Sequence, residues 1–308
     1  MTKAIVFPGQ GSQSVGMLSE LYEASAVVKN TFKEASDALG YDMWALVSEG
    51  SSEQLNKTEF TQPALLTCSV AIWRDYIAKG GELPAYLAGH SLGEYSALVC
   101  AEVISLADAV LLVQKRGQYM QQAVPAGTGA MAAIIGLDDE LVSKACTDSA
   151  QGDVVAPVNY NSPGQIVIAG EKAAVERAMV LAKELGAKRA LPLPVSVPSH
   201  CELMKPAADK LAADLEQLKF NTPVIPVINN VDVATPNSGE DIKLALVKQL
   251  YSPVRWTETI QQCHKLGVSN VIEFGPGKVL TGLGKRIEKS INYSAANDMA
   301  TLAAAVAE

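Results

Sequence analysis

Histidine and paired cysteine are scarce in this sequence of 308 residues. It contains 3 histidines and 5 cysteines, and the cysteines are scattered with no Cys-x-x-Cys pair. Such a distribution indicates neither a zinc site nor a disulfide framework, so we expect reduced and mostly buried thiols. Any histidine chemistry must therefore use His90, His200 or His264.

Long apolar runs are also missing. No segment approaches the roughly 18–20 apolar residues of a membrane-spanning helix. The chain starts with only Ile5, Val6 and Phe7 before Pro8, which is too short for the apolar core of a signal peptide. We therefore expect a cytoplasmic protein with no membrane partner.

The charge balance excludes another class of function. The sequence has 25 Lys and Arg against 33 Asp and Glu, a formal net charge of −8 at pH 7. Broad nucleic-acid binding requires a basic surface, so we expect no nucleic-acid partner. Hydrophobic residues make up 48% and charged residues 19% of the chain, which suits a globular protein with a full core.

Helical patterns and short apolar runs alternate along the chain, which is typical of an α/β protein. For the larger part of the chain we predict strands at 4–8, 85–89, 224–230 and 270–275, and helices at 61–80, 94–103, 241–251, 256–267 and 278–289.

The stretch from about 130 to 195 follows a different order. We predict strands at 130–137, 154–161, 165–170 and 188–195, and helices at 138–150 and 171–187. This β-α-β-β-α-β succession is the ferredoxin-like order. It predicts a small domain at 129–196 inserted into a large domain formed by 1–128 and 197–308.

Residues 89–93 read Gly-His-Ser-Leu-Gly, a G-x-S-x-G pattern between a predicted strand and a predicted helix. That context is the one a nucleophile elbow requires. The turn would raise the Ser91 hydroxyl clear of the sheet. It would also direct the Leu92 N–H, at the start of the helix, toward the group that Ser91 attacks. We therefore predict Ser91 as the nucleophile.

A glycine-rich loop, Gly9-Gln10-Gly11, follows the first predicted strand. It does not match the dinucleotide fingerprint, because Ser14 stands where the third glycine belongs, and no P-loop string occurs in the chain. In elbow enzymes the second oxyanion donor comes from a loop after another strand. We therefore predict the Gln10 and Leu92 N–H groups as the oxyanion hole.

A nucleophilic serine needs a base. His90 adjoins Ser91, but its side chain should point away through the turn, and His264 lies in a polar helix pattern that indicates solvent exposure. His200, at the end of a predicted strand, is the remaining candidate. No convincing aspartate completes a triad, and Glu202 would point away from His200 in an extended chain.

Seven segments together resemble the malonyl-CoA:acyl carrier protein transacylases of bacterial fatty-acid synthesis. They read FPGQGSQSVGM, TQPALLT, GHSLGEYSALV, GTGAMAAIIGL, NYNSPGQIVIAG, PVSVPSHCELM and EFGPGKVLTGL, in this order along nearly the whole chain. The acyltransferase domains of polyketide synthases are relatives of this family. The resemblance implies an α/β-hydrolase-like large domain with a ferredoxin-like insert. It also implies a coenzyme A thioester substrate with no metal and no other cofactor.

The resemblance also implies residue roles. It identifies Ser91 as nucleophile and His200 as base, with the second ring nitrogen of His200 held by the backbone carbonyl of Gln249. It assigns Arg116 to the malonyl carboxylate, although the residues alone favour a solvated helix charge. The small Ser199 beside the base goes with malonyl rather than methylmalonyl selection in the polyketide relatives.

The function that follows is transfer of malonyl from malonyl-CoA to the phosphopantetheine thiol of acyl carrier protein through a malonyl-serine intermediate. A serine thioesterase or other hydrolase would use the same serine and base. A polyketide-type acyltransferase, or a non-catalytic carrier-docking module, are further alternatives.

The family's carrier proteins are generally acidic, which implies a basic docking surface. The first candidates are Lys285, Arg286 and Lys289 on the last basic helix, and the second are Lys188 and Arg189 in the insert. Ordinary solvated helix faces would show the same pattern.

Overall fold

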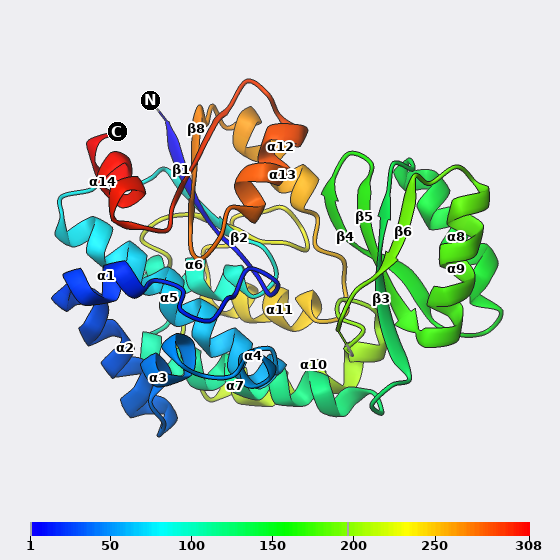
Figure 1. Ribbon diagram of the computed structural model, residues 1–308, viewed down its shortest axis with the longest axis horizontal. Coiled ribbons are helices and arrows are strands. Elements are labelled where there is room, and N and C mark those ends of the chain that lie inside the picture. Colours follow the sequence, from blue (N-terminus) through cyan, green and yellow to red (C-terminus); the bar gives the residue numbers. More distant parts are fainter. Residues whose placement is uncertain (1, 196) are drawn as a thin grey trace.

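The computed structural model describes residues 2–195 and 197–308. Two lobes lie side by side, one around a five-stranded sheet and the other around a four-stranded sheet (Figure 1). The mixed α/β class predicted from the sequence is confirmed. Met1, the first residue of the predicted large domain, and Ser196, the last residue of the predicted insert, lie outside the described residues.

The larger sheet is parallel throughout, in the order β7-β2-β1-β8-β9. Its strands are β7 (Val227–Ile228), β2 (Tyr86–Gly89), β1 (Lys3–Phe7), β8 (Asn270–Phe274) and β9 (Asn292–Ala296). Every residue of the central strand β1 is buried, as expected for a parallel strand with helices on both faces.

Alternate residues of β1 serve two separate apolar layers, because successive strand side chains point to opposite faces. Ile5 and Phe7 join the core that contains α2, α5, α6 and α7, whereas Ala4 and Val6 join the layer under α12 and α13. These helices are α2 (Ala26–Leu39), α5 (Thr58–Ala78), α6 (Gly93–Cys100), α7 (Leu106–Ala123), α12 (Trp256–Lys265) and α13 (Val279–Ile287).

Helix α5 is buried over most of its length and packs against α2, α6 and α7. Its apolar residues surround the helix rather than forming one stripe, which is typical of a helix inside a core. It begins at Thr58, three residues before the predicted start at 61. This central position brings the first turns of α5 next to the inner face of α7.

The small lobe has an antiparallel sheet in the order β4-β5-β3-β6. Helices α8 and α9 pack on one face of it, and the other face carries a smaller apolar cluster around Met131 and Cys201. The elements are β3 (Gly129–Ile135), α8 (Asp139–Ala150), β4 (Val155–Ser162), β5 (Gln165–Glu171), α9 (Lys172–Glu184) and β6 (Arg189–Pro192).

Two predicted strands are shorter in the structure. The strand predicted at 224–230 is reduced to Val227–Ile228, and the one predicted at 188–195 to Arg189–Pro192. Prolines border both: Pro226 precedes β7, and Pro192 and Pro194 lie at the end of β6. Proline has no N–H for the ladder, so sheet pairing stops near it.

The remaining elements were not predicted individually from the sequence. They are α1 (Ser19–Ala24), α3 (Met43–Ser48), α4 (Ser52–Leu55), η1 (Glu202–Met204), α10 (Lys205–Glu216) and α14 (Met299–Ala307). The helix predicted at 241–251 is α11 (Gly239–Gln249). Within residues 2–195 and 197–308, none of the helices combines the length and the hydrophobicity that crossing a bilayer requires.

Candidate active site

The turn from β2 into α6 has the tight geometry expected of a nucleophile elbow. Ser91 adopts a φ of 52°, a left-handed conformation that costs energy for a residue with a side chain. A Cβ on Gly89 would lie 1.9 Å from the carbonyl carbon of Gly93, and a Cβ on Gly93 would lie 2.0 Å from the Phe7 oxygen. Both glycines are therefore required, because the turn, α6 and β1 approach one another closely.

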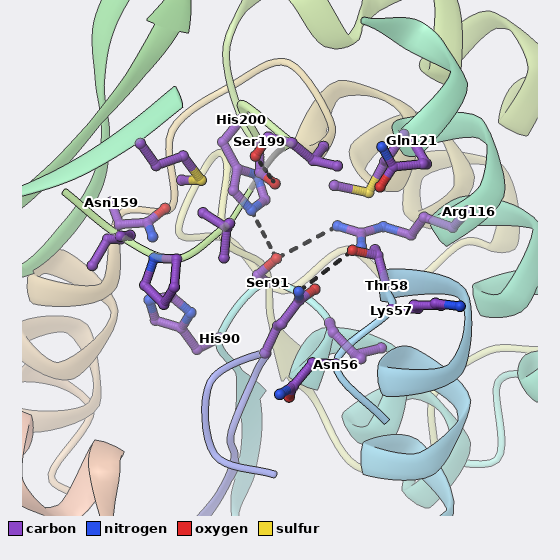
Figure 2. A pocket seen from close by; sticks show the side chains of 18 of the residues that line it. Asn56, Lys57, Thr58, His90, Ser91, Arg116, Gln121, Asn159, Ser199 and His200 are labelled. Carbon is purple, nitrogen blue, oxygen red and sulfur yellow. Dashed lines mark hydrogen bonds between the residues drawn. The ribbon is translucent and has the colours of Figure 1, made fainter. Parts of the chain in front are cut away.

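The Ser91 hydroxyl is hydrogen bonded to His200. Ser91 comes from the part of the large lobe that precedes the small lobe in the sequence, and His200 comes from the part that follows it. Ser91 Oγ lies 2.7 Å from His200 Nε2 (Figure 2). His200 Nδ1 lies 2.8 Å from the carbonyl oxygen of Gln249. A carbonyl can only accept, so Nδ1 carries the proton and Nε2 accepts from the serine. The imidazole is thus held in the tautomer of a general base.

Burial keeps this histidine neutral. The His200 side chain is buried, and desolvation together with the nearby Arg116 charge lowers its pKa to about 3. The ring therefore stays unprotonated through the physiological pH range and can accept the serine proton.

Arg116 extends from α7 toward the same serine. Its Nη1 donates to Gln62 Oε1 at 2.8 Å, and its Nη2 donates to Gln249 Oε1 at 3.1 Å and lies 3.5 Å from Ser91 Oγ. The guanidinium packs on the Tyr95 ring, with Cζ 5.4 Å from the ring centroid. Only 1% of the residue is exposed, so this is a buried cation rather than the solvated charge that the residues alone favour.

The charge of Arg116 has no carboxylate bonded to it within residues 2–195 and 197–308, and its buried Nε has no hydrogen-bond partner there. Arginine keeps its charge even where burial lowers its pKa, as it does here. A buried charge that no counter-ion contacts directly is costly. The site is therefore prepared for an anion close to Ser91.

Behind the serine lies a polar network that sequence reasoning missed. Gln249 Nε2 donates to Ser91 O at 3.1 Å and to Glu94 Oε2 at 2.8 Å. Asn230 Nδ2 donates to Gly89 O at 2.6 Å, its Oδ1 accepts from the Ser91 N–H at 2.7 Å, and its own N–H donates to Glu94. The sequence did contain features that could have indicated this network. Glu94 interrupts an otherwise apolar helix pattern, and Asn230 ends a strand pattern.

The predicted oxyanion donors line the same cavity as Ser91. The backbone N–H groups of Gln10 and Leu92 donate no hydrogen bond to any described part of the chain. The Ser91 N–H, by contrast, is already taken by Asn230. A Cβ on Gly9 would lie 2.5 Å from the His90 oxygen, so the loop after β1 packs directly on the elbow.

The cavity lies between the two lobes and measures about 360 Å³. Ser91 and Arg116 line it from the large lobe, and Asn159 from the small one (Figure 2). Met131 of the small lobe lines it too. Ser199, which precedes His200 in the chain, also lines it. An acyl group bound here would be enclosed by both lobes.

Neither His90 nor His264 is hydrogen bonded to the Ser91 hydroxyl, as a base would be. His90 Nε2 is hydrogen bonded to Asn161 Oδ1 at 2.8 Å. His264 is exposed on α12, and Glu202 is exposed on η1. The structure thus brings Ser91 Oγ and His200 together. His90 lines the same cavity but is bonded to Asn161, and His264 and Glu202 lie at the surface.

The basic residues considered for docking are all exposed. Lys285 and Arg286 lie on α13 with Lys289 just beyond it, and Lys188 and Arg189 lie at the start of β6. None of them forms an ion pair with a described residue.

A serine on a strained strand-to-helix turn is typical of α/β enzymes that move acyl groups through serine, when it is bonded to a neutral buried histidine and shares a cavity with unbonded backbone N–H groups. This fold and site define an acyltransferase. The chain belongs to the acyl transferase domain family, whose model matches residues 4–305.

The similarity extends over the whole chain. It is 61% identical over 303 residues to the malonyl CoA-acyl carrier protein transacylase of Escherichia coli (strain K12), covering 98% of each chain. A solved acyl carrier protein S-malonyltransferase from Vibrio cholerae is 67% identical, with a TM-score of 0.97 and 99% of both chains covered. The family resemblance noted in the sequence is confirmed.

A further solved structure holds a type II PKS acyl-carrier protein in complex with its malonyl-transacylase. That match is 61% identical, with a TM-score of 0.99, and it covers 100% of this chain and 99% of the other.

Proposed function

We propose that this acyltransferase moves a malonyl group from malonyl-CoA to the phosphopantetheine thiol of acyl carrier protein. The observation that carries the proposal is the buried Arg116 guanidinium, 3.5 Å from Ser91 Oγ and without a bonded carboxylate among the described residues. A guanidinium offers two parallel donors to a carboxylate. The names of the close relatives, which are malonyl transferases, support the same substrate.

The first half-reaction would acylate Ser91. The Ser91 oxygen attacks the thioester carbonyl while its proton passes to His200 Nε2. The Gln10 and Leu92 N–H groups stabilise the oxyanion, and each such donor is typically worth about 2.7–4 kcal/mol in the transition state. The carbon–sulfur bond then breaks, and the coenzyme A thiol leaves with the proton from His200.

The second half-reaction would reverse these steps with a new thiol. The phosphopantetheine sulfur attacks the malonyl-serine ester and gives its proton to His200. The oxyanion collapses, the ester bond breaks, and His200 returns the proton to Ser91. This is ping-pong chemistry through a covalent intermediate. The Gln249 carbonyl keeps the His200 ring in the required orientation throughout.

We assign Ser199 to substrate selection. It lines the cavity next to His200 and has a short side chain. Its short polar side chain offers a branched acyl group no apolar contact, which supports selection of malonyl.

For the fold, we propose an α/β-hydrolase-like large domain, residues 1–128 and 197–308, with a ferredoxin-like insert at 129–196. The parallel strand order and the β2-elbow-α6 connection support the first assignment. The β-α-β-β-α-β succession and the sheet order β4-β5-β3-β6 support the second.

Two expectations stay predictions. One is that the enzyme needs no metal and no cofactor other than its coenzyme A substrate; within the described ranges, no group of three or more His, Cys, Asp and Glu is placed to hold a metal ion. The other is a cytoplasmic location.

Intact-mass analysis after mixing with malonyl-CoA tests the proposal. The wild type should gain one malonyl mass, mapped to Ser91 by peptide analysis, and Ser91→Ala should gain none. Adding holo acyl carrier protein should move the mass to the carrier. An adduct on a cysteine would refute the nucleophile, and rapid loss of the adduct to water without transfer would favour a thioesterase.

A polyketide-type role is the alternative, because one close relative was solved with a type II PKS acyl-carrier protein. Comparing kcat/KM for a fatty-acid carrier and a polyketide carrier separates the two roles.

A further inference from the structure

Glu94 is a buried carboxylate directly behind the nucleophile, and the reaction steps above do not use it. It is 2% exposed, in the first turn of α6. One oxygen, Oε2, accepts from both Gln249 Nε2 at 2.8 Å and the Asn230 N–H at 3.0 Å. Burying a carboxylate costs free energy of desolvation, so the interactions of Glu94 must offset that cost.

A single side chain connects this carboxylate to Arg116. Gln249 donates through Nε2 to Glu94 and accepts through Oε1 from Arg116 Nη2 at 3.1 Å. The amide cannot be reversed, because Nε2 also donates to the carbonyl of Ser91, which can only accept. The site therefore contains a cation, an oriented amide and an anion in series.

The charges around Glu94 balance only when no substrate carboxylate is present. Arg116 faces it from α7 as the cation, and Asp232, after β7, adds a weaker negative contribution from a surface ion pair with Lys248 at 2.9 Å. His200 is neutral in this environment.

Two further titratable groups lie on the segment 90–95 and are uncharged. Burial lowers the pKa of His90 and raises the pKa of Tyr95 to about 12, so both are neutral near pH 7. A malonyl carboxylate paired with Arg116 would thus face Glu94 as a second negative charge.

We propose that Glu94 is a positioning and specificity residue whose carboxylate must take up a proton from solvent when the malonyl carboxylate pairs with Arg116. Glu94 orients Gln249 toward Arg116 before malonyl binds, and protonation removes the negative charge of Glu94 when the malonyl carboxylate arrives. The inference rests on the proposed malonyl transfer.

The direction of the pH effect follows from the charges. Burial already raises the pKa of Glu94 to about 7, against the opposing effects of its hydrogen bonds and of Arg116. Malonyl binding neutralises Arg116 and adds a negative charge, so it raises this pKa further. Above pH 7 malonyl must therefore compete with Glu94 ionisation, whereas acetyl, which has no carboxylate, does not.

The first measurement is the ratio of kcat/KM for malonyl-CoA to that for acetyl-CoA between pH 6 and pH 9. Both donors carry coenzyme A, so its ionisations cancel in the ratio. In the wild type the ratio should fall about 10- to 100-fold as pH rises, the size expected for like charges separated by one bridging side chain.

Glu94→Gln removes the charge and keeps the acceptor. A glutamine oxygen in place of Oε2 can still accept from Gln249 and Asn230, so the orientation of the network is retained. The malonyl-to-acetyl ratio should then be independent of pH and exceed the wild-type ratio at pH 9. Asp232→Asn is the matched control, because it removes the nearby exposed carboxylate, and it should keep the wild-type fall.

The second measurement is proton uptake and needs no variant. Wild-type enzyme is mixed with malonyl-CoA in weakly buffered solution at pH 8 with an indicator dye. Up to about one proton should be taken up per acylated Ser91 in excess of the value for acetyl-CoA.

A constant wild-type ratio, the same fall in Glu94→Gln, or equal proton uptake with both donors would overturn the role of Glu94 while leaving malonyl transfer intact. Absence of a malonyl adduct on the wild type would instead overturn the proposed function, and this inference with it.

Discussion

Replacing Arg116 with alanine should change which acyl group the enzyme accepts. The side chain is 1% exposed, and its hydrogen-bond partners among the described residues are neutral side-chain oxygens on Gln62, Gln249 and Ser91. A malonyl carboxylate would be the anion bound by this charge. Without Arg116 that carboxylate enters a pocket with no cation to receive it.

The magnitude follows from the cost of an unpaired buried charge. Removing one member of a desolvated charge pair typically costs about 2–5 kcal/mol. At about 1.4 kcal/mol per tenfold, malonyl transfer by Arg116→Ala should fall roughly 30- to several-thousand-fold. Arg116→Lys should recover only part of this loss, because a point charge cannot form two parallel hydrogen bonds to a carboxylate.

Acetyl transfer should behave differently. Acetyl has no carboxylate, and the wild-type cation remains without a bonded counter-ion when acetyl is bound. Transfer from acetyl-CoA by Arg116→Ala should therefore hold steady or increase, and the malonyl-to-acetyl ratio of kcat/KM should collapse.

The assay is kcat/KM for both donors, on proteins whose folding is verified by circular dichroism. Lys115→Ala is the matched control, since Lys115 is adjacent on α7 but points outward to Asp214 at 2.6 Å. It should leave both donors unchanged. Equal losses for malonyl and acetyl in Arg116→Ala would show that Arg116 is a structural residue, and that selectivity lies elsewhere.

The remaining predictions concern the base, the elbow and the carrier. His200→Ala should slow acylation about 10²–10⁴-fold, the usual contribution of a general base, whereas His264→Ala should match the wild type in the same stopped-flow experiment. Gly93→Ala should lower Tm, with a cost of about 1–3 kcal/mol or more, because its Cβ would meet a β1 carbonyl oxygen at 2.0 Å. Gly282→Ala, which has open space around it, should show no such loss in thermal melts. Lys285→Glu should raise the KM for carrier protein but not for malonyl-CoA; equal effects on both would reject that docking surface.

The sequence predicted the tight turn at Ser91 because such an elbow is a local feature. A strand pattern, five residues with glycine at both ends and a helix pattern specify Ser91 without long-range information. The glycines at 89 and 93 are needed for close backbone contacts, which explains why their spacing is informative. His200 could also be predicted from the sequence as the candidate base, because the chain contains only three histidines.

The ends of two strands and the burial of Arg116 were harder to predict from the sequence. Apolar patterns at 188–195 and 224–230 indicate strands, but prolines inside them end the hydrogen-bonded ladders early. Arg116 lies beside Lys115 in the sequence, and nothing local indicates that one is buried and the other exposed. That difference depends on how α7 packs against α5.

By itself, the sequence determined the α/β class, the elbow with Ser91, and the short set of histidines from which the base must come. These features depend on residue spacing and on local backbone preference. Only the tertiary structure decided the polar network, in which Glu94 meets Gln249, 155 residues away, and the Ser91 N–H meets Asn230, 139 residues away. The physical reason is that a buried polar group finds its partner through the packing of distant elements, and sequence periodicity carries no record of which element that will be.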